Sequence, residues 1–189
     1  MKIFGNLIIS IMFLFSVCKG QMAGVKVNDM DAVLLAKDTN SSYSYGVAFP
    51  VSSHTWVTAA HVIDGSQGSV RLGNSKSFSG IRSARVLWKN LNKDIALLYC
   101  PKAVKKWHEI EAAQEREKEL IPVKYPSRNT DYMYHIYAIG QPGKAVDGQS
   151  GSPHIQGEKV TGVIVASSQG KTYSSPFDRE DIEAIRKAG

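Results

Sequence analysis

The chain has 189 residues and a formal net charge of +6, with 43% hydrophobic and 21% charged residues. This length is enough for one domain with its own hydrophobic core. The charge is mildly positive, without a Lys/Arg stripe or an interleaved aromatic face, so we expect no nucleic-acid partner. The five histidines show no ligand spacing, so we expect neither a metal ion nor another cofactor.

The first twenty residues have the features of a secretory signal peptide. Lys2 supplies a positive start, residues 7–17 form an apolar run, and Cys18 and Gly20 are small residues placed before a possible cut. We expect residues 1–20 to be removed, leaving 21–189 as a secreted or periplasmic domain. The run is short for a membrane span, which needs about 20 residues. The alternative is an uncleaved segment that anchors the protein to a membrane; otherwise we expect no stable membrane insertion.

Cleavage would remove Cys18 and leave Cys100 alone, so no intramolecular disulfide is expected. Cys100 ends an apolar run and is expected to be a buried, inert thiol. The fold must then be stabilised by packing.

Short apolar runs separated by Gly, Ser, Asn and Pro clusters predict an all-β domain after the signal. The first group of predicted strands covers residues 32–36, 45–50, 55–59, 69–72, 84–88 and 95–99. The second group covers residues 120–124, 132–139, 153–156, 160–166 and 171–174.

Two segments have helical composition. Residues 107–120 are rich in Glu, Ala, Gln, Lys and Arg, which are good helix formers, and they connect the two groups of strands. The second helix is expected to begin near Asp178, which can cap it, with Asp181 three residues on. Ile182 and Ile185 provide its buried side.

Three short motifs contain the residue types of an acyl-transfer site: TAAH ends at His61, DIALL begins at Asp94, and GQSGSP contains Ser150. A serine hydroxyl is a weak nucleophile, so a general base must take its proton and a carboxylate must fix the tautomer of that base. The chain order His, Asp, Ser is one of the few in which this geometry recurs.

Each motif also has an ordinary structural explanation. G-x-S-G is a common tight turn, His61 fits a hydrogen-bonded histidine at a buried strand end, and Asp94 fits a turn carboxylate. The conjunction of three motifs in the correct order favours an active site over three separate coincidences.

Together the three segments resemble the trypsin-like (chymotrypsin-fold) serine peptidases, which typically carry T-A-A-H, D-[IL]-A-L-[IL] and G-x-S-G-[GS]-P. The serine segment is most similar to bacterial glutamyl endopeptidases, and AIGQP at residues 138–142 is similar to HtrA-type peptidases. The resemblance spans residues 45–176. It implies two antiparallel β-barrels of the six-stranded type, at about residues 30–100 and 119–176, and a C-terminal helix at about 178–188. The catalytic groups would lie in the cleft between the barrels.

The resemblance also implies a role for each site residue. His61 would be the general base, Asp94 would accept the imidazole N–H, and Ser150 would attack the carbonyl carbon. The backbone N–H groups of Gly148 and Ser150 would form the oxyanion hole. Gly148 suits this place because a Cβ would hinder the required turn.

The substrate pocket is expected to involve Lys144, Ala166 and Ser167. Lys144 lies where family members often place the residue at the base of the primary pocket, so a weak preference for acidic side chains is one hypothesis; Lys144 pointing into solvent is the other. The small side chains of Ala166 and Ser167 would form unobstructed walls of this pocket. The histidine that glutamyl endopeptidases carry on the strand after the serine has no counterpart in residues 161–166.

Two departures from the family pattern change the expectations. Only seven residues separate Gly140 from Gly148, so either residues 132–139 take the role of a later strand or the second barrel is trimmed. Gln149 replaces the Asp that pancreatic-type members pair with a freed N-terminus. We therefore expect an enzyme that is active once it has folded and been exported.

The leading functional hypothesis is an exported serine endopeptidase, a hydrolase that acts on protein or peptide substrates through a Ser-His-Asp triad and an acyl-enzyme intermediate. An esterase would share this chemistry. The alternative from a different class is a catalytically silent, peptidase-like scaffold that binds a partner. The trimmed second barrel favours the scaffold mildly, whereas the intact His61, Asp94, Ser150 and Gly148 favour the enzyme.

Overall fold

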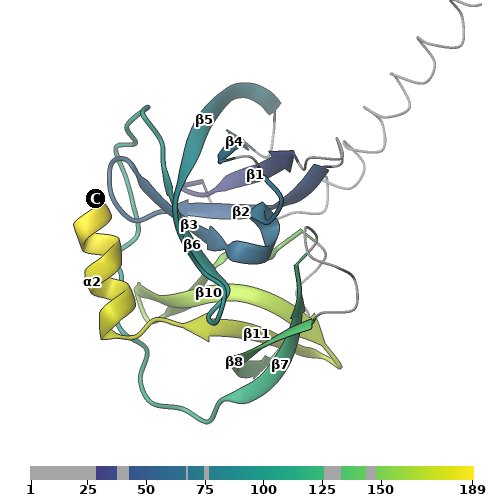
Figure 1. Ribbon diagram of the computed structural model, residues 1–189. Helices are drawn as coiled ribbons and strands as arrows, with labels where there is room; N and C mark the ends of the chain where they lie inside the picture. The colour runs from purple at the N-terminus through teal and green to yellow at the C-terminus, as the bar shows by residue number, and fades with distance from the viewer. Residues whose placement is uncertain (1–28, 38–42, 67, 75–76, 126–132, 144–147) are drawn as a thin grey trace, which may run out of the picture.

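The computed structural model describes residues 29–37, 43–66, 68–74, 77–125, 133–143 and 148–189. The predicted signal, residues 1–20, lies outside them. The described part is built mainly of antiparallel strands in two units, with one α-helix near the C-terminus (Figure 1). The all-β prediction is therefore confirmed. None of the described helices is both long and apolar enough to cross a membrane.

The first unit is a closed barrel with the strand order β1-β2-β3-β6-β5-β4. Pairing of β1 with β4 closes it, and all six strands predicted for this region are present. β3 is buried along its whole length because it pairs with β2 and β6 and contacts β10 of the second unit. The strands are β1 (Ala32–Lys37), β2 (Tyr43–Pro50), β3 (Thr55–Ala59), β4 (Ser69–Asn74), β5 (Ser77–Asn90) and β6 (Ile95–Tyr99).

The second unit is a five-stranded sheet with the order β7-β8-β11-β10-β9. Its strands are β7 (Glu119–Lys124), β8 (Met133–Pro142), β9 (Pro153–Gln156), β10 (Lys159–Ser168) and β11 (Lys171–Pro176). β8 pairs with β7 on one side and with β11 on the other. In the described residues the unit is thus one strand smaller than the first barrel. A trimmed second unit is one of the two alternatives that the short spacing before Gly148 left open.

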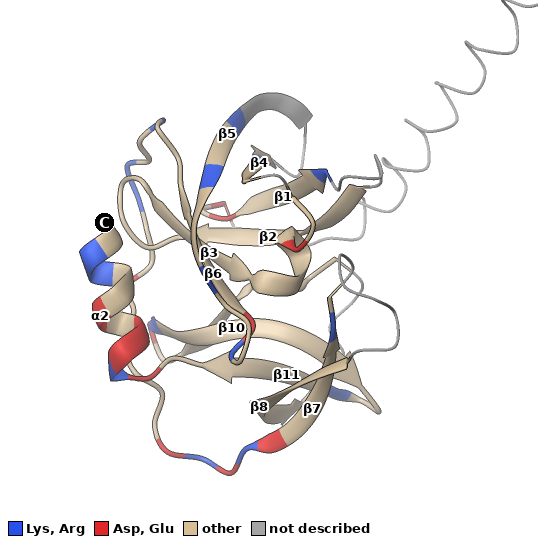
Figure 2. Cartoon of the chain, viewed as in Figure 1, with Lys and Arg blue, Asp and Glu red and all other residues tan. Residues whose placement is uncertain are grey.

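The helix α2 (Arg179–Ala188) follows the second sheet and lies beside both units (Figure 1). The Asp178 side chain accepts a hydrogen bond from the Asp181 backbone, and the Asp181 side chain accepts one from the Asp178 backbone. Figure 2 shows acidic residues in the first turn and basic residues in the last, which suits the helix dipole. The predicted cap and the predicted buried side, Ile182 and Ile185, are both confirmed.

The helix predicted for residues 107–120 is absent: residues 107–118 form no helix, and β7 begins at Glu119. The Glu111 N–H donates to the carbonyl of Val160 at 3.0 Å, and the Ala113 N–H donates to that of Phe177 at 2.8 Å. These bonds satisfy the backbone through tertiary contacts. Helix propensity of a fraction of a kcal/mol per residue is easily outweighed by such contacts.

Candidate active site

His61 and Asp94 form the centre of the candidate site. His61 lies in the short 3-10 helix η1 (Ala60–Ile63), which follows β3 directly. The imidazole Nδ1 lies 2.6 Å from Asp94 Oδ2, and the His61 backbone N–H donates to Asp94 Oδ1 at 2.7 Å. Asp94 is fully buried, whereas the His61 side chain is 19% exposed. An ionised carboxylate at Nδ1 favours the tautomer with its proton on Nδ1, which leaves Nε2 as a proton acceptor.

Asp94 reaches His61 because it adopts an unusual backbone conformation. Its φ is +54°, in the left-handed region that Asp enters more readily than most residues. In this conformation the Asp94 carbonyl accepts the Ala60 N–H at 3.0 Å while its carboxylate faces His61. The preceding turn is held by Asn92, whose N–H donates to Asn90 Oδ1 at 3.1 Å. The loop between β5 and β6 is thus shaped to place this carboxylate under η1.

A third donor to Asp94 comes from the residue that follows β7, and no sequence motif marks it. The Tyr125 hydroxyl lies 2.9 Å from Asp94 Oδ1 and 3.1 Å from the carbonyl of Leu91. Tyr125 is fully buried. Burial, and then the negative charge of Asp94, raise the pKa of Tyr125 well above its ordinary value, so the phenol stays protonated.

Ser150 lies where the second unit meets the first barrel. Its carbonyl accepts the Val47 N–H at 2.9 Å. A Cβ added to Gly46 would lie 2.6 Å from the Ser150 carbonyl oxygen and 2.8 Å from Val62 Cγ1, so Ser150 passes close to the residue after His61. Among the described residues no hydrogen bond joins the Ser150 hydroxyl to His61. Such bonds are often long before substrate binds.

Glycines shape the turn around Ser150. Gly148 has a φ of +86° and Gly151 one of +91°. Gly151 also lies against the first barrel, since an added Cβ would approach the Val47 carbonyl oxygen to 2.1 Å and Thr58 Oγ1 to 2.5 Å. Its N–H donates to the carbonyl of Ile164 on β10 at 2.7 Å. The turn therefore rests on both units at once.

The substrate pocket is described only in part. Lys144 lies outside the described residues. Ala166 is half-buried and Ser167 exposed near the end of β10, where they pair with Tyr173 and Thr172 of β11. Both residues therefore lie on β10, and their role as walls of a substrate pocket stays a prediction.

Of the other carboxylates that could serve His61, Asp31 is engaged elsewhere. Its Oδ1 lies 2.7 Å from His108 Nε2, and both side chains are buried. Asp64 caps the C-terminal end of η1, where its N–H donates to the His61 carbonyl at 3.4 Å. Two further aspartates, Asp38 and Asp147, lie outside the described residues. The described carboxylate on the His61 ring is that of Asp94.

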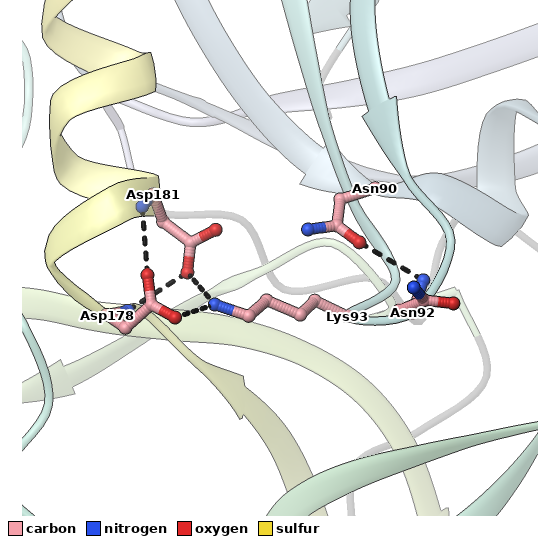
Figure 3. A network of polar contacts seen from close by, with 5 residues as sticks. All are labelled: Asn90, Asn92, Lys93, Asp178 and Asp181. Carbon is pink, nitrogen blue, oxygen red and sulfur yellow. Dashed lines mark hydrogen bonds and ion pairs between the residues drawn. The ribbon is translucent and has the colours of Figure 1, made fainter.

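Lys93, next to Asp94, ties the same loop to the C-terminal helix. Figure 3 shows its side chain extended toward the start of α2, where Nζ contacts Asp178 and lies 2.7 Å from Asp181 Oδ2. Burial lowers the pKa of Lys93, but hydrogen bonds to Asp178 and Asp181 outweigh it, so the pKa lies above its ordinary value. The ion pair therefore favours the folded, charged form.

Lys93→Met should destabilise the fold because it leaves Asp181, whose side chain is 3% exposed, without its cation. Lys93 and Asp178 are partly solvated, so we expect a loss of about 2 kcal/mol, less than for a fully buried pair. Thermal unfolding followed by circular dichroism should show a Tm lower by roughly 4–8 °C. Lys187→Met is the matched control, since its partner Glu183 is 3.9 Å away and both are exposed. Equal Tm values for the two variants would contradict the role given to Lys93.

The described fold is similar to those of solved serine proteases. The active form of the Rv3671c protease from M. tuberculosis is 14% identical with a TM-score of 0.65, over 90% of this chain and 85% of that one. The human pathogenic astrovirus serine protease is 20% identical with a TM-score of 0.54, over 80% and 91%. The serine endoprotease from Yersinia pestis is 13% identical with a TM-score of 0.57, over 88% and 65%.

No family model matches the chain, and no curated protein matches it either. At these low identities the structural likeness establishes the fold alone. The resemblance to glutamyl endopeptidases and HtrA-type peptidases stays a prediction. The chain has the fold of the trypsin-like serine proteases.

Proposed function

We propose that the chain is an exported serine endopeptidase that acts through Ser150, His61 and Asp94. The observation that carries the proposal is the pair of hydrogen bonds from His61 to the fully buried Asp94 carboxylate. The hydrogen bond from the Val47 N–H to the Ser150 carbonyl, which places Ser150 beside the first barrel, supports it. Export rests on the signal features of residues 1–20, and the substrates are proteins or peptides.

The arrangement supports acyl transfer in two steps. Ser150 Oγ attacks the scissile carbonyl carbon while His61 Nε2 takes the hydroxyl proton, and Asp94 stabilises the imidazolium that results. The imidazolium then gives its proton to the leaving amine as the C–N bond breaks. A water molecule, deprotonated by His61, then attacks the acyl carbon; the bond from that carbon to Ser150 Oγ breaks, and the imidazolium returns the proton to Oγ. The N–H groups of Gly148 and Ser150 stabilise the oxyanion, and the φ of +86° at Gly148 supports this role.

Peptide hydrolysis by residues 21–189, without further trimming, tests the proposal. Ser150→Ala should reduce kcat/KM by about 10⁶-fold, to background, because triad members act as a unit. The Tm should remain that of the wild type, since only a hydroxyl is lost. Hydrolysis that survives in Ser150→Ala would assign the activity to another residue or to a contaminant.

For specificity we propose a weak preference for an acidic side chain before the scissile bond, through Lys144. A peptide library should show this preference reduced in Lys144→Ala. An unchanged cleavage profile would remove Lys144 from the pocket.

A peptidase-like binding scaffold is the second candidate. The smaller second sheet, five strands in the described residues, favours it. A scaffold would show no Ser150-dependent hydrolysis and no reaction of Ser150 with an active-site reagent.

A further inference from the structure

The Asp94 carboxylate has more hydrogen-bond donors than a His–Asp pair requires. Oδ2 faces the His61 ring at 2.6 Å. Oδ1 accepts two donors, the His61 N–H at 2.7 Å and the Tyr125 hydroxyl at 2.9 Å. A carboxylate that is held at one oxygen by two donors cannot rotate without breaking both bonds. The tyrosine therefore fixes which oxygen is left for the imidazole.

Tyr125 directly follows β7, a strand of the second sheet, whereas His61 and Asp94 lie next to strands of the first barrel. Its ring packs edge to face on Tyr134 of β8, with the centroids 4.9 Å apart. Its hydroxyl also lies 3.1 Å from the Leu91 carbonyl in the loop that ends at Asp94. The phenol thus spans from β7 and β8 to the loop that carries the carboxylate.

We propose that Tyr125 is a positioning residue of the candidate active site: its hydroxyl holds the Asp94 carboxylate in the orientation that faces the His61 ring. Because Tyr125 follows β7, this orientation depends on the packing of the second sheet against the first barrel. The effect of Tyr125 on turnover is expected only if the proposed peptidase function holds, so this part of the inference rests on the proposed function. Tyr125 touches neither the substrate nor the reacting atoms, and it acts through Asp94. Its phenol hydrogen bond offsets part of the charge at Oδ1 and keeps Oδ2 directed at Nδ1 when the imidazolium forms.

Tyr125→Phe tests this inference because it removes only the hydroxyl. We expect kcat for peptide hydrolysis to fall about tenfold, the effect of losing one hydrogen bond to a charged group, while KM stays within about twofold. The second readout is the downfield proton resonance of His61 Nδ1–H, assigned by its loss in His61→Gln. In Tyr125→Phe this resonance should move upfield and broaden, because the bond to Asp94 becomes longer and less uniform.

Two further samples separate positioning from a general structural effect. Tyr173→Phe removes another tyrosine hydroxyl that contacts a carboxylate, Glu119, at 3.2 Å; it should leave the His61 resonance in place. 3-Fluorotyrosine incorporated at position 125 retains the donor and should restore both kcat and the resonance. This sample also tests the inference if Tyr125→Phe does not fold.

The readouts distinguish failure of this inference from failure of the proposed function. Active wild type together with unchanged kcat and resonance in Tyr125→Phe would overturn the role of Tyr125 alone. Inactive wild type would overturn the peptidase proposal, and the resonance would still decide whether Tyr125 positions Asp94. Loss of the wild-type resonance pattern with 3-fluorotyrosine, where the hydroxyl remains, would also overturn the inference.

Discussion

Asp94→Asn should lower kcat/KM about 10⁴-fold, the loss expected when the imidazole is held in the wrong tautomer. The geometry fixes how the amide would lie. Two donors, the His61 N–H and the Tyr125 hydroxyl, require an oxygen at the Oδ1 position. The NH₂ group must then occupy the Oδ2 position and donate to Nδ1, which leaves the proton on Nε2. An Nε2 that carries a proton cannot accept one from Ser150. The measurement is peptide hydrolysis at neutral pH by the variant and the wild type.

Asp31→Asn is the matched control for this variant. It makes the same chemical change in the other buried His–Asp pair, where Asp31 Oδ1 lies 2.7 Å from His108. Per folded molecule, this control should keep wild-type kcat/KM. Substantial turnover by Asp94→Asn together with a large loss in Asp31→Asn would show that Asp94 is the wrong carboxylate.

Gly151→Ala should destabilise the fold and displace Ser150. The residue has a φ of +91°, and a new Cβ would lie 2.1 Å from the Val47 carbonyl oxygen. Left-handed backbone costs a non-glycine residue about 1–2 kcal/mol, and the clash with the backbone of β2 adds to it. We expect a total loss of at least about 3 kcal/mol. The Tm in a thermal melt should fall by roughly 6–12 °C.

Gly157→Ala separates the two contributions. Gly157, in the turn between β9 and β10, has a φ of +63° but nothing within 4 Å of an added Cβ. It should therefore show only the conformational cost, about 1–2 kcal/mol. If both variants lowered the Tm equally, close approach of the Ser150 turn to β2 would not be a source of strain.

The predictions from sequence that hold depend either on local patterns or on motifs that a known protein family brings together. The continuous apolar runs of β3 and β6 predict buried strands, and both are buried in the structure. Asp178 and Asp181 have the spacing of a capping box, and that box starts α2. The motifs that end at His61 and begin at Asp94 predict the contact between them, which the structure contains at 2.6 Å.

The features that sequence could not provide depend on contacts between distant segments. Residues 107–118 have helical composition, but backbone bonds to Val160 and Phe177 decide their path. Tyr125 lies 31 residues from Asp94 in the chain and no motif marks it. The partners of Lys93, Asp178 and Asp181 at the start of α2, are 85 and 88 residues away in the chain. A single sequence carries no pattern that pairs such positions.

The central claim is that Ser150 is an activated nucleophile, and reaction with a fluorophosphonate tests it most directly. Residues 21–189 would be treated with the reagent and analysed by mass spectrometry, with His61→Ala and heat-denatured protein as controls. The account predicts a single adduct on Ser150 in the folded wild type and none in either control. A folded wild type that gains no adduct, or gains it on another residue, would contradict the account and favour a binding scaffold.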